Sequence, residues 1–61
     1  MAKLTVQELA AIKDQLTAEQ NLINKFTVYS QTITDMHLSE KCKEIAGKHQ
    51  QHYDKLLSYL N

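Results

Sequence analysis

The chain of 61 residues has no proline, no tryptophan, a single glycine and a single cysteine. The absence of proline and the scarcity of glycine favour helix, because these two residues are the strongest breakers of helical structure. The lone cysteine, Cys42, excludes a disulfide bond within the chain. At this length we expect residues 1–61 to form one domain, and a domain this small is often marginally stable unless it associates.

The charges are balanced, since seven basic residues face seven acidic ones. A chain without a basic field is not expected to gather nucleic acid. It has no apolar run long enough to span a membrane, and its first residues lack the apolar core of a signal peptide. We therefore expect an intracellular protein with no nucleic-acid or membrane partner. The sequence also lacks a glycine-rich phosphate loop and a nucleophile–base set, so a non-enzymatic function is favoured.

The first predicted helix has a distinct start. Thr5-Val6-Gln7-Glu8 has the pattern of a capping box, in which the Thr5 and Glu8 side chains each bond the other's backbone amide. After this start, mainly apolar residues recur at steps of three and four. They are Leu9, Ile12, Leu16, Glu19, Ile23, Phe26, Ser30 and Ile33, of which only the glutamate and the serine are polar. This repeat predicts a helix over residues of about 6–33.

The second predicted helix follows a turn at about residues 34–36. Asp35 is a suitable cap for it, and Ser39 is a competing cap four residues later. The core stripe of this helix again has steps of three and four. It contains Leu38, Cys42, Ile45, His49, His52, Leu56 and Tyr59. The pattern predicts a helix over residues of about 37–60.

A short turn makes the two helices antiparallel neighbours. If the turn is centred near Asp35, residues at the same level have numbers that add up to about 71, so Glu19 lies level with His52, one turn from His49. Two helices cannot cover both of their apolar stripes. We therefore expect an all-α fold in which the antiparallel two-helix hairpin dimerises into a four-helix bundle.

Three polar residues, Glu19, His49 and His52, occupy predicted core positions, and they allow two interpretations. They could form a buried hydrogen-bond network that sets the register and pairing of the dimer. They could instead bind a transition metal such as zinc, iron, copper or nickel, since the two imidazoles are spaced i,i+3 on one helical face. We interpret Cys42 as a core residue, because buried free cysteine usually behaves as a small apolar side chain.

Several of these features resemble the coat F family of small ferritin-like spore coat proteins from endospore-forming bacteria. The resemblance is carried by Thr-Val-Gln-Glu-Leu at 5–9, by Glu-Gln at 19–20 and by Lys-His-Gln-Gln-His-Tyr at 48–53. Longer members carry two hairpins in one chain, so a chain with one hairpin is expected to dimerise. The resemblance implies a structural spore-coat protein whose partners are a second copy and other coat proteins.

The ferritin-like resemblance also bears on the metal. Di-iron members of that fold take one glutamate from each of two helices and a Glu-x-x-His pair from each of the other two. On that pattern Glu19 matches the lone glutamate and His52 the histidine, whereas His49 stands where the second glutamate belongs. A dimer would offer two carboxylates and four imidazoles, so we expect at most a transition-metal site different from a di-iron centre.

Overall fold

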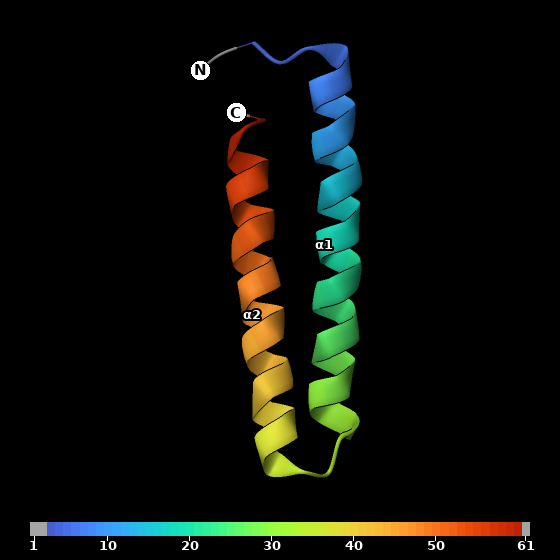
Figure 1. Cartoon of the computed structure of the whole chain (residues 1–61), viewed down its shortest axis with the longest axis vertical. Helices are drawn as coiled ribbons and strands as arrows, with labels where there is room; N and C mark the ends of the chain where they lie inside the picture. The colour runs from blue at the N-terminus through green and yellow to red at the C-terminus, as the bar shows by residue number, and fades with distance from the viewer. Residues whose placement is uncertain (1–2, 61) are drawn as a thin grey trace.

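The computed structural model describes residues 3–60 and contains two α-helices, α1 (Val6–Thr32) and α2 (Met36–Ser58). The helices run antiparallel along each other and form a hairpin, with the two chain ends at the same end of the molecule (Figure 1). The hairpin is elongated, with extents of 46 × 16 × 11 Å. The predicted all-α antiparallel hairpin is therefore confirmed.

The capping box at the start of α1 is present as predicted. The backbone N–H of Glu8 donates to Oγ1 of Thr5 at 3.0 Å, and the backbone N–H of Thr5 donates to Oε1 of Glu8 at 2.9 Å. The hydrogen bonds from Thr5, chiefly the one from its backbone, lower the pKa of the Glu8 carboxyl. At the other end, the N–H of Ile33 closes the last turn on the Tyr29 carbonyl, so α1 stops one residue earlier than expected.

Only residues 33–35 connect the helices. Asp35 caps α2 by accepting a hydrogen bond from the Leu38 backbone N–H at 2.8 Å. The competing cap, Ser39, lies inside α2 and ties the helices together, because its hydroxyl donates to the Ser30 carbonyl at 2.5 Å. The connection is thus centred near residue 34, one residue before the predicted centre at Asp35. Residues at the same level therefore have numbers that add up to about 68, as for Glu19 and His49, and not to about 71.

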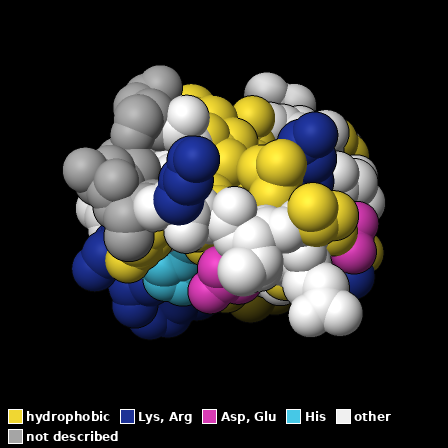
Figure 2. Space-filling model, turned by 90° about the horizontal axis from the view of Figure 1, so that it is seen from above, with side chains coloured by type: hydrophobic (Ala, Val, Ile, Leu, Met, Phe, Trp, Pro, Cys, Tyr) yellow, Lys and Arg dark blue, Asp and Glu magenta, His cyan; other side chains and the backbone are white. Residues whose placement is uncertain are grey.

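The hairpin encloses very little. Within residues 3–60, only Cys42 (5% exposed) and Glu19 (6% exposed) are buried. Several large apolar side chains are more than one-third exposed, and hydrophobic atoms reach the surface over a wide area when the molecule is viewed from the end that holds the chain termini (Figure 2). Neither α1 nor α2 combines the length and the apolar character that a membrane-crossing helix needs.

Candidate metal centre

Glu19 is the central residue of the site. It stands at the midpoint of α1, with thirteen residues of the helix on either side. Its position in the apolar repeat turns it toward α2, and the packed helices leave its side chain only 8% exposed. A carboxylate in such a position is unfavourable unless hydrogen-bond donors surround it.

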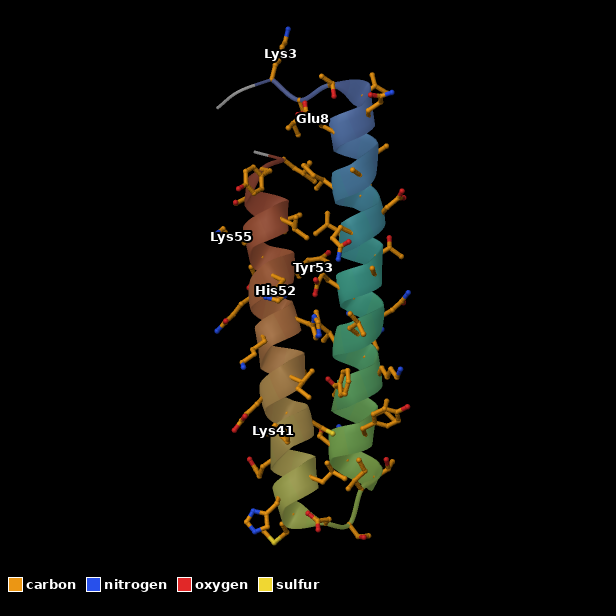
Figure 3. The ribbon with its side chains drawn as sticks, viewed as in Figure 1. Lys3, Glu8, Lys41, His52, Tyr53 and Lys55 are labelled. Atoms are coloured by element: carbon orange, nitrogen blue, oxygen red, sulfur yellow. The ribbon has the colours of Figure 1, made fainter. Side chains whose placement is uncertain are left out.

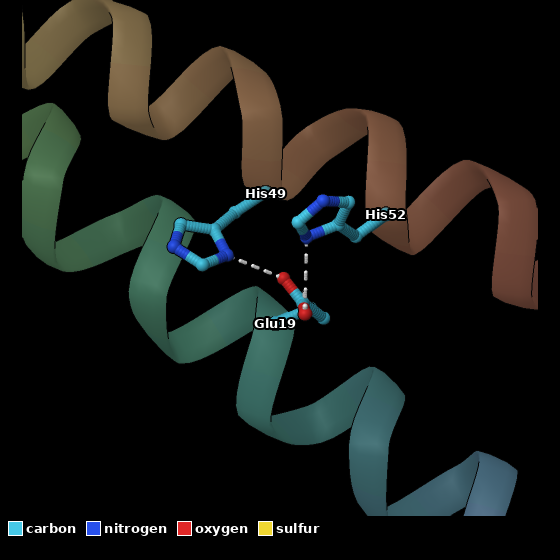
Figure 4. A group of neighbouring side chains, drawn as sticks. All are labelled: Glu19, His49 and His52. Carbon is cyan, nitrogen blue, oxygen red and sulfur yellow. Dashed lines mark hydrogen bonds and ion pairs between the residues drawn. The ribbon is translucent and has the colours of Figure 1, made fainter.

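Two histidines of α2 lie against this carboxylate (Figure 4). Nδ1 of His49 lies 2.6 Å from Oε2 of Glu19, which is the distance of a strong, charge-assisted hydrogen bond. Nδ1 of His52 lies 3.5 Å from Oε1, close enough for an ion pair when the ring is protonated. The i,i+3 spacing on α2 brings the two rings together, with centroids 5.5 Å apart in an edge-to-face arrangement.

A residue of α1 completes the surroundings of the carboxylate. Nε2 of Gln15, one turn before Glu19, donates to Oε1 at 3.3 Å, so both carboxylate oxygens have a partner. Burial alone would raise the pKa of Glu19. The hydrogen bonds from His49 and Gln15, together with the charges of His49 and His52, outweigh burial and hold this pKa below its ordinary value. Glu19 is therefore an ionised carboxylate at neutral pH.

The ionised carboxylate also determines how the His49 ring is protonated. A carboxylate only accepts hydrogen bonds, so Nδ1 of His49 must carry the proton that it shares with Glu19. In the neutral ring Nε2 is then free to accept a proton or a metal, and Figure 4 shows it turned away from Glu19. The ring of Phe26 stacks on the His49 ring at a centroid distance of 6.4 Å and restrains its orientation.

The prediction that Glu19 and the histidines would meet is confirmed, but their order differs from the prediction. Glu19 contacts His49 more closely than His52, because the connection lies one residue earlier in the chain than predicted and places His49 at the level of Glu19. The His52 side chain is 59% exposed, so within one hairpin it lies at the rim and not in the core. Gln15 was not predicted to take part, although its i,i+4 spacing from Glu19 is a signal that the sequence contains.

The three residues offer suitable metal ligands. One ligand atom from each of Glu19, His49 and His52 can be chosen so that all lie within 4.8 Å of one another. In a tetrahedral zinc site, ligand atoms about 2.0–2.1 Å from the metal are about 3.4 Å apart. The 3.5 Å between Oε1 of Glu19 and Nδ1 of His52 fits this spacing. The 2.6 Å between Oε2 of Glu19 and Nδ1 of His49 is shorter, so these two atoms would have to move apart, and Nδ1 would have to lose its proton, for both to bind one metal.

Cys42 does not belong to this group. It is buried and carries a free thiol, and it precedes His49 by seven residues, or about 10 Å along α2. It packs as a core residue, as its burial indicates.

No protein-family model, curated protein or solved structure matches this chain.

Proposed function

We propose that this chain is a non-enzymatic structural protein of the spore-coat type, and that its working form is a homodimeric four-helix bundle. The main support for a dimer is that one hairpin has almost no buried core, since Cys42 is the only buried apolar residue within 3–60. A hairpin whose apolar side chains are nearly all at least partly exposed gains stability when a second hairpin covers them.

The role in a coat is supported by the surface and by the resemblance to coat F proteins. Six glutamines lie exposed along both helices, and the basic and acidic side chains balance, so the exterior is polar and has no net charge. Such a surface can pack against other proteins without strong charge repulsion. The His-Gln-Gln-His stretch at 49–52 is the most specific part of the resemblance.

The coat proposal requires that an endospore-forming bacterium encodes the chain, and it is tested in that organism. We expect the protein to be made during sporulation, to be extracted from purified spores with the coat fraction, and to be missing from that fraction in a deletion strain. Recovery of the chain only from vegetative cells would contradict the proposal. The dimer is tested separately by sedimentation equilibrium of the purified protein, for which a single-chain mass at all concentrations is the contradicting result.

A second candidate function is the binding of a transition metal, favoured by the mutual approach of Glu19, His49 and His52. Imidazole and carboxylate ligands suit zinc, iron, copper and nickel. Titration of the chelator-treated protein with zinc should give saturable binding with release of protons. His52→Ala should abolish this binding, while Gln51→Ala, the neighbouring exposed position, should leave it intact. Equal binding by both variants would contradict this site.

A further inference from the structure

The two open edges of the helix pair differ in chemistry. On α2, four residues at steps of seven line one edge of the contact with α1. They are Leu38, Ile45, His52 and Tyr59, and three of the four are apolar or aromatic. Residues seven apart lie on almost the same face of a helix, so this row forms a continuous strip beside the buried positions. Leu38 and Tyr59 are 52% and 48% exposed.

A matching row on α1 borders the same edge. Glu8, Gln15, Leu22 and Tyr29 also follow at steps of seven. Two observations place the rows together. Gln15 and His52 both contact Oε1 of Glu19, and Glu8 and Tyr59 line the same open groove of about 350 Å³. We call the surface formed by these two rows the His52 face.

The opposite edge is polar in its outer rows. Its α1 row consists of Lys13, Gln20 and Thr27, and its α2 row consists of Lys43, Gln50 and Leu57. All six residues are exposed, and Leu57 is the only apolar one. We call this surface the Gln50 face. Polar and charged side chains keep their hydration there, so the gain from covering this face is smaller than for the His52 face.

The exposed area of the chain is large for its mass. The chain exposes 4833 Å², whereas a compact protein of 7.0 kDa exposes about 4000 Å². The excess of about 800 Å² equals the area that one partner buries in a stable interface of standard size. The radius of gyration of 14.3 Å, against about 10.5 Å for a compact chain of this length, has the same cause. The extra exposed area is therefore about the area that a single partner of similar size would bury.

We propose that a second copy of this chain docks on the His52 face. This inference rests on the dimer of the proposed function and identifies its interface. Glu19 is the midpoint of α1. A two-fold dimer in which the hairpins overlap along their full length therefore brings the two Glu19–His49–His52 clusters together, whether the hairpins point the same way or opposite ways.

His52 is the residue of each cluster that meets the other copy. It lies at the rim of the hairpin with Nδ1 toward Glu19, and Figure 4 shows Nε2 turned away from the carboxylate. Lys41 and Lys55 lie along α2 on either side of His52 (Figure 3). By helical spacing they belong to the rows next to that of His52, on the side away from α1. A charged border of this kind is typical of an interface, whose centre is apolar and whose rim is charged. The pair of clusters thus forms one polar layer inside an apolar interface.

The test compares one glutamate placed on each face. Leu38→Glu alters the His52 face at the third residue of α2, where a glutamate suits the helix start, so the hairpin itself should stay folded. Leu57→Glu is the matched control on the Gln50 face, where the leucine is 41% exposed. Circular dichroism checks that both variants are helical, and sedimentation equilibrium measures the dimer dissociation constant of each.

We expect Leu38→Glu to raise the dissociation constant about thirtyfold, since each dimer loses two half-exposed leucines from the interface. Leu57→Glu should leave it within about threefold of the wild-type value. Weakening by Leu57→Glu alone would overturn the assignment of the face while leaving the dimer in place. A wild-type chain that never dimerises would overturn the dimer itself, so the two failures are distinct.

Discussion

Replacing Gly47 with alanine tests how much of α2 is free of neighbours. Gly47 is the midpoint of α2, with eleven helical residues on either side, so it has no part in a cap. A Cβ atom built there meets no atom within 4 Å, and its φ is not positive. Alanine is favoured over glycine inside a helix by about 1 kcal/mol, because glycine has more backbone freedom to lose on folding.

We therefore expect Gly47→Ala to stabilise each chain by about 1 kcal/mol. For a domain of this size that corresponds to a rise in Tm of about 4–8 °C. Thermal unfolding followed by circular dichroism at a fixed protein concentration measures the shift, and sedimentation equilibrium shows whether the dimer is retained. A loss of stability would refute the reasoning, because it would mean that a second helix packs closely against Gly47 on the outer side of α2.

Three further predictions concern the cap and the polar cluster. Thr5→Ala removes the capping box and should destabilise the chain by about 1 kcal/mol in urea unfolding. Thr17→Ala is the control and should not, because the Thr17 hydroxyl bonds only a carbonyl of its own helix. Equal effects of the two variants would contradict the role of the cap. Because the pKa of Glu19 is lowered in the folded state, its ionised form stabilises the fold fully above the ordinary value of about 4.5, and this contribution is lost as the pH falls through the folded-state pKa. The urea midpoint of the wild type should then approach that of Glu19→Gln as the pH is lowered from 7 to 3, and a constant difference would contradict this. Replacing Glu19, His49 and His52 together with leucine should leave the stability of the fold unchanged or raise it, whereas Glu19→Ala alone should lower it. A triple variant that no longer folds in the absence of metal would show that the polar cluster is required for folding.

Much of the fold could be predicted because its signals are local. The start of α1 depends on Thr5 and Glu8, which are three residues apart, and both helices are indicated by repeats along their own length. The end of α2 was less predictable. The apolar pattern continues through Tyr59 and Leu60, but the helix ends at Ser58, and the N–H groups of Tyr59 and Leu60 bond carbonyls three residues back. Such tightening is typical of the last turn of a helix.

The polar cluster was predicted in composition but not in geometry. Its residues were recognisable because a carboxylate and imidazoles interrupt apolar stripes. Their pairing depends on the register between the helices, which a difference of one or two residues in the connection changes. As a result, Glu19 bonds His49 directly and His52 lies at the rim.

The exposure of His52 and Leu38 could not be predicted from the repeat pattern either. A stripe with steps of three and four does not distinguish residues that face the helix in the same chain from residues that face a second copy. The structure separates them: Cys42 and His49 face α1, whereas Leu38 and His52 line the open edge. This division is the reason that a second copy is proposed on that edge.

The dimer is tested most directly by a native mass spectrum of the untagged, wild-type protein purified without chelator. We predict that the dominant species has twice the 7.0 kDa mass of the chain, because one hairpin leaves its apolar stripes only partly covered. A spectrum that contains only the single chain, at concentrations where the protein is helical, would contradict the proposal that the hairpin is half of a four-helix bundle.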